Sequence, residues 1–92
     1  MGYLTGFPEG LEGIASRDAY EELKKARANF PEFNSAHEGF AVLAEEVSEL
    51  WDHVKLKQSK RDPVAMRKEA IQIAAMSLRF AIEVCDQQQC SR

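Results

Sequence analysis

The chain has 92 residues, of which 45% are apolar and 29% are charged, and its formal net charge is −3. These values are typical of one small soluble domain, and the acidic balance argues against a basic surface for nucleic acid. The sequence contains neither the roughly 18-residue apolar run of a membrane span nor the basic and apolar segments of a signal peptide. We therefore expect no nucleic-acid partner, no membrane partner and, by default, a cytoplasmic location.

The first 15 residues hold four of the five glycines, and the backbone freedom of glycine makes such a segment expensive to order. We expect an irregular segment over residues 1–15 that packs against a helical domain at 16–92 or against a partner subunit. A first helix is predicted at 16–29, because Ser16 or Asp18 can cap its free N–H groups and Pro31 prevents its continuation.

A second helix is predicted at 35–58, starting with a capping box formed by Ser35 and Glu38. Apolar residues recur in it at three- and four-residue steps, which places them on one face. This face comprises Phe40, Leu43, Val47, Leu50 and Val54, and it is widened by Ala44 and Trp51. We expect it to be a core face, with the basic residues after it complementing the helix dipole.

A third helix is predicted at 63–86, with Asp62 as its N-cap and Pro63 in its first turn. It is apolar on nearly all sides, and one partner helix cannot bury both sides. The fold class is therefore all-α: three helices that complete a four-helix-type bundle as a homodimer or homotetramer. Cys85 is expected to be buried and Cys90 to lie in a tail, without a structural disulfide.

A row of carboxylates accompanies the apolar faces. Glu46 and Glu49 lie on one flank of the second helix, with His53 one turn further along. Glu69 has apolar neighbours one and two turns on, so its charge needs a paired cation, a metal or a raised pKa. A solvated acidic helix face, with Glu69 paired to a lysine or arginine, is the alternative.

The residues Glu-Glu-Val-Ser-Glu at 45–49, followed after 19 intervening residues by Glu-Ala-Ile-Gln at 69–72, resemble a known motif. It belongs to the MazG-like all-α nucleoside triphosphate pyrophosphohydrolases, whose pattern is E-x-x-E, a spacer and E-x-x-D on the next helix. The resemblance covers residues 35–84. It implies four magnesium-binding side chains and hydrolysis of a (deoxy)nucleoside triphosphate to the monophosphate and pyrophosphate.

Carried over by position, the resemblance makes Glu46, Glu49 and Glu69 ligands of Mg²⁺, with Mn²⁺ as an alternative ion. Gln72 takes the fourth place, where the family has aspartate. Glutamine keeps an oxygen ligand but removes one negative charge, so metal affinity and water activation should fall. Glu49 is also the candidate catalytic base.

Three further residues are candidate substrate contacts. Lys57 is the leading phosphate contact, because a helix continuing to residue 58 would place it on the same flank as Glu46 and His53. His53 and Arg79 are the others. A lysine at a helix end also complements the helix dipole, and an i,i+4 pair with Glu83 explains Arg79 equally simply.

The sequence thus supports two functions. One is a Mg²⁺-dependent nucleotide pyrophosphohydrolase, favoured by the three retained glutamates. The other is a catalytically silent helical module for self-association or partner binding, favoured by Gln72 and the short length.

Overall fold

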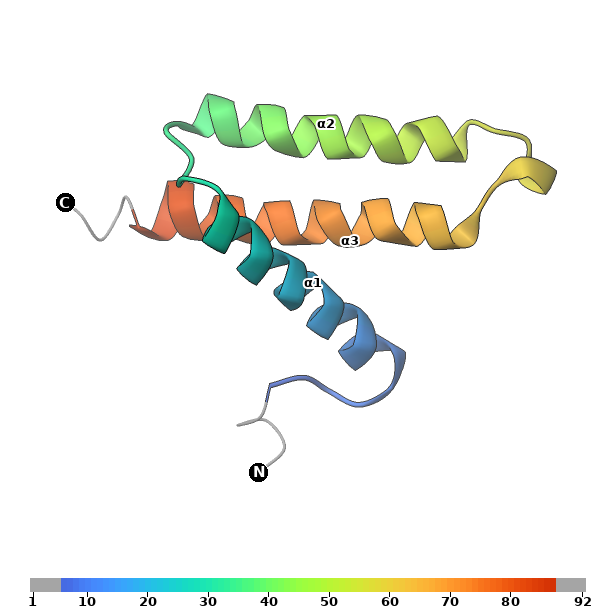
Figure 1. Ribbon diagram of the computed structural model, residues 1–92, viewed down its shortest axis with the longest axis horizontal. Helices are drawn as coiled ribbons and strands as arrows, with labels where there is room; N and C mark the ends of the chain where they lie inside the picture. Colours follow the sequence, from blue (N-terminus) through green and yellow to red (C-terminus); the bar gives the residue numbers. More distant parts are fainter. Residues whose placement is uncertain (1–5, 88–92) are drawn as a thin grey trace.

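The computed structural model describes residues 6–87, and in this part of the chain every regular element is helical (Figure 1). The elements are α1 (Gly10–Asn29), α2 (Ala36–Val54), the short 3-10 turn η2 (Gln58–Lys60) and α3 (Pro63–Phe80). α3 continues without a break into a π-helical turn, η3 (Ala81–Asp86). The predicted all-α class is confirmed. None of these helices has the length and apolar character that a membrane crossing requires.

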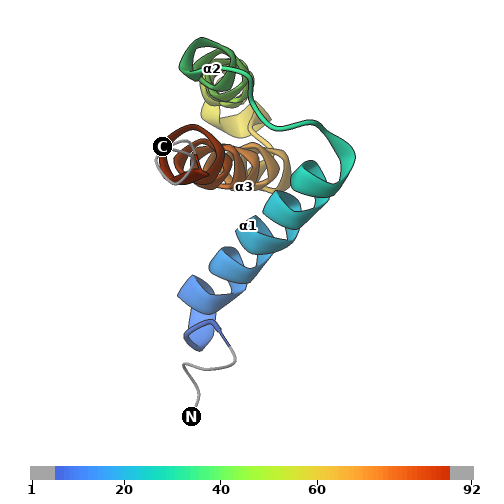
Figure 2. The same cartoon turned by 90° about the vertical axis from the view of Figure 1, so that its left-hand side faces the viewer.

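α3 is the central element of the fold. α2 runs antiparallel beside it, and α1 crosses it obliquely and diverges from α2 toward the N-terminal end (Figures 1 and 2). A small core lies where the three helices meet. Its buried and partly buried residues are Leu23, Ala26, Ala75 and Met76, with Val42, Leu43 and Ile82 packed against them.

Gly39 sets the close approach of α2 to the end of α3. A Cβ atom at this position would lie 2.7 Å from a ring carbon of Phe80 and 3.1 Å from one of Phe33. The two rings therefore occupy the space that a side chain at position 39 would need, and they hold the 30–34 turn against both helices.

α1 begins at Gly10, six residues before the predicted start, so neither Ser16 nor Asp18 is its cap. Gly13 lies directly against the carbonyl group of Pro8, where a Cβ atom would collide with it. This contact lets residues 6–9 fold back along the helix, and the ring of Phe7 packs on that of Tyr20 at 5.7 Å between centroids. Part of the segment expected to be irregular is thus helical.

The other two helix starts agree with the capping expectations. The Ser35 hydroxyl accepts from the Glu38 N–H at 3.0 Å, and the Asp62 carboxylate accepts from the first N–H groups of α3. α2 ends at Val54 rather than near residue 58. There the Arg61 side chain donates to the carbonyl oxygens of Val54 and Leu56 at 2.9 and 3.1 Å, which satisfies groups that a longer helix would have used.

The molecule is open and flat, with extents of 51 × 39 × 19 Å and a radius of gyration of 15.1 Å. A compact domain of this length has a radius of gyration of about 12 Å. The accessible surface is 6827 Å², against about 5,400 Å² for a compact monomer of this size. The chain therefore buries less surface than its length allows.

The apolar face of α2 is divided. Leu43, Leu50 and Val54 are partly buried on the α3 side, whereas the side chains of Phe40 and Trp51 are 64% and 58% exposed. The expectation that Trp51 lies in the core is wrong for this chain, because α3 covers only one side of a wide stripe. Cys85, expected to be buried, is exposed, and Cys90 lies outside the described residues.

Candidate metal centre and adjoining cavity

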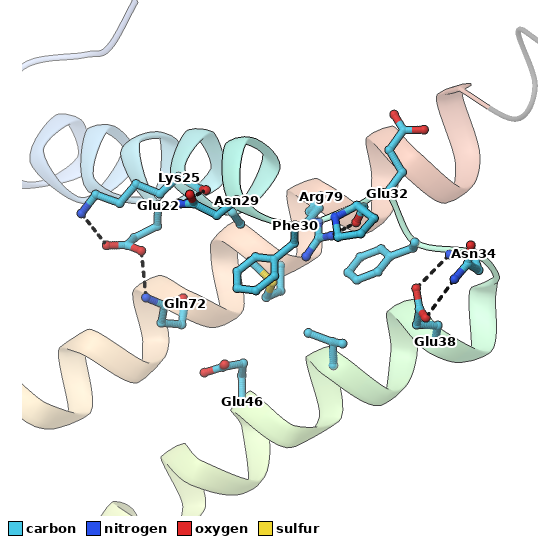
Figure 3. Close-up of a pocket in the computed structure, with 15 residues that line it drawn as sticks. Glu22, Lys25, Asn29, Phe30, Glu32, Asn34, Glu38, Glu46, Gln72 and Arg79 are labelled. Carbon is cyan, nitrogen blue, oxygen red and sulfur yellow. Dashed lines mark hydrogen bonds and ion pairs between the residues drawn. The ribbon is translucent and has the colours of Figure 1, made fainter.

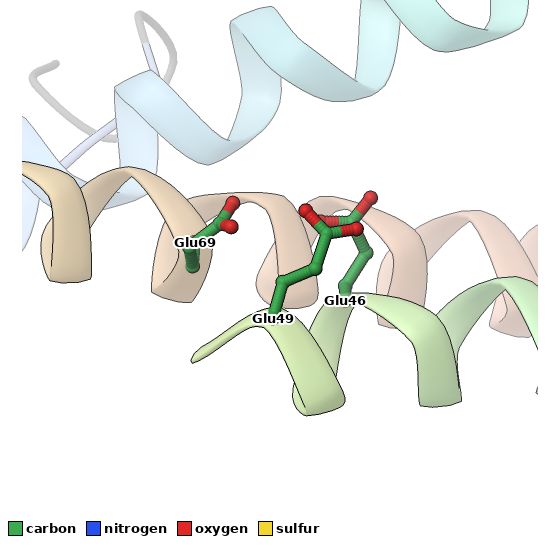
Figure 4. A group of neighbouring side chains, drawn as sticks. All are labelled: Glu46, Glu49 and Glu69. Carbon is green, nitrogen blue, oxygen red and sulfur yellow. The ribbon is translucent and has the colours of Figure 1, made fainter. Parts of the chain in front are cut away.

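Three glutamates converge between α2 and α3 (Figure 4). Glu46 and Glu49 lie one turn apart on α2, and the antiparallel packing of α3 brings Glu69 to the same place. Each offers a carboxylate oxygen, these oxygens all lie within 4.8 Å of one another, and all three residues are partly buried. The structure therefore brings together the three glutamates that the sequence singled out.

The three carboxylates interact strongly with one another. Burial raises the pKa of Glu46, and the charges of Glu49, Glu69 and Glu45 raise it further. A hydrogen bond with Glu69 raises the pKa of Glu49, with further contributions from the charge of Glu69 and from partial burial. Two carboxyl groups share a hydrogen bond only when one of them holds a proton, so the cluster disfavours full ionisation unless a cation compensates it.

His53 lies beside this cluster. Its Nε2 atom is 4.0 Å from Oε2 of Glu69, and its side chain is about one third exposed. At this distance a positive charge on the imidazole would offset part of the negative charge of the cluster.

Gln72 points its amide nitrogen away from α2, toward α1. Nε2 donates to Oε2 of Glu22 at 2.9 Å, and Oε1 of Glu22 pairs with Lys25 at 3.4 Å. A carboxylate only accepts hydrogen bonds, so this contact fixes the orientation of the amide and turns Oε1 of Gln72 away from Glu22. No sequence pattern pointed to Glu22, which lies in an ordinary charged stretch of α1.

Arg79 is buried, and only 5% of its surface is exposed. Its Nε atom lies 3.2 Å from both oxygens of Glu83, and Nη2 donates to the carbonyl oxygen of Pro31 at 2.6 Å. Glu83 also accepts from the N–H of Phe33 at 2.9 Å. The i,i+4 pair that offered the simpler explanation of Arg79 is therefore present, and it ties η3 to the 30–34 turn.

Lys57 lies in the connection after α2 and is exposed. Since α2 ends at Val54, the helical periodicity that placed Lys57 on the flank of Glu46 and His53 does not reach it. Of the three predicted substrate contacts, His53 borders the acidic cluster and Arg79 borders the cavity described next. The geometric argument for Lys57 no longer holds.

A cavity of about 580 Å³ opens between α1, α2, α3 and the 30–34 turn (Figure 3). Glu46 belongs both to this cavity and to the acidic cluster, so the two are continuous. The remaining walls combine apolar and polar side chains, which include Glu22, Lys25, Asn29, Phe30, Phe33, Asn34, Glu38, Val42, Gln72, Met76 and Arg79. A pocket of this volume and mixed lining is suited to a small organic molecule.

Comparison of the chain with protein-family models, with curated proteins and with solved structures found no match.

Proposed function

We propose that the protein is a Mg²⁺-dependent nucleotide pyrophosphohydrolase, which converts a (deoxy)nucleoside triphosphate to the monophosphate and pyrophosphate. The observation that carries this proposal is the convergence of Glu46, Glu49 and Glu69 between two helices. Their order and spacing are also those of the MazG-like motif that the sequence resembles.

The donor set fits magnesium. Mg²⁺ prefers oxygen ligands and is commonly held by a few carboxylates together with waters and substrate phosphates. Burial and the neighbouring carboxylates raise the pKa of Glu46, and a hydrogen bond and charge from Glu69 raise that of Glu49. A bound dication would favour the ionised form of both groups. When bound, Mg²⁺ neutralises phosphate charge and lowers the pKa of a coordinated water.

In this proposal the side chains of the protein accept the proton and bind the nucleoside. Glu49 is suited to accept a proton from the attacking water, because a raised pKa brings a carboxylate closer to the range of an efficient general base. The nucleoside occupies the cavity, with its phosphates directed toward Glu46. Phe30 and the 30–34 turn, held by Arg79, cover the side of the cavity away from the acidic cluster.

We also propose that the working form is a homodimer or homotetramer, in which a partner covers the bare apolar surface. At about 100° per residue, Phe40, Val47 and Trp51 fall in one narrow stripe of α2, and all three are exposed in the single chain. Leu78 of α3 is 45% exposed as well. Covering this surface would complete a four-helix-type bundle and bury apolar area that a monomer leaves in water.

The alternative is a catalytically silent module that keeps the bundle for self-association or partner binding. The specific observation in its favour is the hydrogen bond between Gln72 and Glu22, which gives the amide a structural role without any metal.

Pyrophosphate release across a panel of ribo- and deoxyribonucleoside triphosphates, with Mg²⁺ or Mn²⁺, separates the two functions. We expect release by the wild type, loss in Glu49→Gln, and retention in Glu45→Gln, which alters an exposed carboxylate on the same helix. No release with any nucleotide and either metal would favour the silent module.

A further inference from the structure

We propose that two copies of the chain pack through one apolar face of the α2–α3 pair, with α2 of each copy lying on α3 of the other. This inference rests on the homo-oligomer of the proposed function and names the surface that each copy offers to the other.

One face of the α2–α3 pair points away from the cavity, and its central side chains carry no charge. Gly39 of α2 meets Phe80 of α3, which fixes the direction in which the two helices face each other. At about 100° per residue, a stripe of small side chains lies roughly a quarter-turn around α3 from Phe80; these residues are Ala70, Ala74, Ser77 and Ala81. The stripe of large apolar side chains on α2 lies roughly a quarter-turn from Gly39; it comprises Phe40, Val47 and Trp51.

Both stripes lie on the same side of the pair. Val42 and Gln72 of the cavity wall are reached by turning the opposite way around their helices. In Figure 2 the 30–34 turn lies to the right of α2 and α3, and the described residues leave the left side uncovered. The large side chains of the α2 stripe are 48–64% exposed, and Ala70, Ser77 and Ala81 are exposed as well. The apolar face is therefore continuous across two helices.

The register of the two helices places large side chains level with gaps between small ones. This register follows from the antiparallel run of α2 and α3 and from the meeting of Gly39 with Phe80. Val47 lies at the level of the gap between Ala70 and Ala74. The same relation holds near the other end of the face, for Phe40 with Ser77 and Ala81.

A two-fold axis parallel to the helices keeps these levels when it generates the second copy. Each α2 then lies antiparallel on α3 of the other copy, and Val47 faces the gap between the partner's Ala70 and the partner's Ala74. Large side chains fill the spaces that small ones leave, as the dense packing of protein interiors requires. The four helices together form a four-helix-type bundle.

The other two-fold arrangement fits these side chains poorly. An axis perpendicular to the helices would place α2 on α2 and α3 on α3. Large side chains would then meet large ones in one half of the interface, and small ones would meet small ones in the other. Since the separation of packed helices follows from the side chains between them, the two halves would need different separations. Size complementarity therefore favours α2 on α3.

Charges at the rim agree with the same arrangement. Asp52 and Arg67 lie at one level of the pair, on the outer flanks of the two stripes. The axis parallel to the helices brings Asp52 beside the partner's Arg67. Within one chain these residues contact Lys55 at 3.1 Å and Asp18 at 2.8 Å, and their side chains keep 61% and 50% of their exposure. An exposed ion pair adds little affinity, but it favours one orientation of the two copies.

The area of the face is that of a small stable interface. α2 has 19 residues, so a face two helices wide measures about 28 Å by about 20 Å, or about 560 Å². Standard interfaces bury about 600 Å² or more on each partner. The single chain also exposes more surface than a compact monomer of its length. A second copy of the chain therefore has an area to cover that matches what a stable dimer needs.

Disulfide cross-linking tests the arrangement of the helices. In a background of Cys85→Ser and Cys90→Ser, Val47→Cys chains and Ala70→Cys chains are purified separately, one with a mass tag, refolded together and oxidised. A disulfide needs Cβ atoms about 3.5–4.5 Å apart, so we expect the mixed product in several-fold excess over either like-with-like product. Glu45→Cys in place of Val47→Cys is the matched control, because Glu45 is exposed on another side of α2. Val47→Cys joined to itself would show α2 on α2 and overturn the inference, as would an oligomer that forms no cross-link.

Filling one of the gaps tests the same face by mass. Ala70→Trp places an indole where the partner's Val47 packs, so it should halve the mass found for the wild type in sedimentation equilibrium. Ala70 is exposed in the single chain, so the helical circular dichroism signal should stay unchanged. Ala28→Trp, at an exposed position of α1, is the matched control and should keep the wild-type mass. The wild-type mass in Ala70→Trp would overturn the inference.

The outcomes separate this inference from the proposed function. A wild type with the mass of one chain overturns both the homo-oligomer and this face. A homo-oligomer that cross-links through Val47→Cys alone retains the assembly and overturns the arrangement of its helices. Pyrophosphate release is measured separately, and the enzyme proposal stands or fails by that assay.

Discussion

Replacing Gln72 with aspartate separates the metal-binding and structural explanations of this residue. The change removes the amide that donates to Glu22 at 2.9 Å and brings a fourth carboxylate toward the acidic cluster. A hydrogen bond to a charged group contributes about 1.5 to 3 kcal/mol. The Glu22 side chain is 30% exposed and also paired with Lys25, so solvent screening favours the lower end of that range.

In chelator, the lost hydrogen bond and the added repulsion should together lower the free energy of unfolding by about 2 kcal/mol. For a domain of this length, this corresponds to a fall in Tm of about 10 °C. With Mg²⁺ present the sign of the electrostatic effect reverses, because a bound dication is the largest local charge. Millimolar Mg²⁺ should therefore raise the Tm of Gln72→Asp by more than it raises that of the wild type.

Thermal and urea unfolding in EDTA and in Mg²⁺ measure both effects. Gln58→Asp is the matched control: it makes the same substitution at an exposed residue of η2, so it should show neither the loss nor the metal-dependent gain. If Gln72→Asp melts lower in both conditions, and Mg²⁺ makes no difference to it or to the wild type, then the amide is purely structural and the metal proposal is wrong.

Three other perturbations test separate parts of the structure. Trp51→Asp should convert the oligomer to the mass of one chain in sedimentation equilibrium, and a wild type that already has that mass would contradict the assembly proposal. Arg79→Met leaves Glu83, which is 3% exposed, with Arg27 as its one remaining charged partner among residues 6–87, so urea unfolding should show a loss of about 3 kcal/mol. The raised pKa values of Glu46 and Glu49 mean that the folded protein retains protons which the unfolded chain releases. The metal-free protein should therefore lose stability as pH rises from the ordinary carboxyl pKa through the raised values, and Mg²⁺ should reduce that loss; a pH-independent Tm would count against the reasoning.

The features that the sequence predicted correctly depend on local chemistry. Ser35 and Asp62 cap the helices that they precede, because their side chains reach N–H groups two or three residues away. The convergence of the three glutamates follows from spacing along α2 and from antiparallel packing of the next helix. The capping residues and the spacing of the glutamates can both be read from short stretches of the sequence.

The features that the sequence missed depend on contacts between distant residues. The early start of α1 relies on Gly13 accommodating the Pro8 carbonyl group, whereas glycine content alone argued against a helix there. Gln72 and Glu22 are 50 residues apart, and nothing in the motif indicates that α1 supplies an acceptor. The end of α2 depends on Arg61 returning to the carbonyl group of Val54.

The exposed apolar stripe and the acidic cluster lie on different sides of α2. At about 100° per residue, Glu46 and Glu49 lie roughly 120° or more around the helix from the centre of the stripe formed by Phe40, Val47 and Trp51. A partner that covers the stripe therefore leaves the acidic flank and its cavity accessible. If Trp51→Asp yields a folded monomer, that monomer should still gain stability from Mg²⁺. A monomer that no longer responds to Mg²⁺ would show instead that the partner helps to form the metal centre.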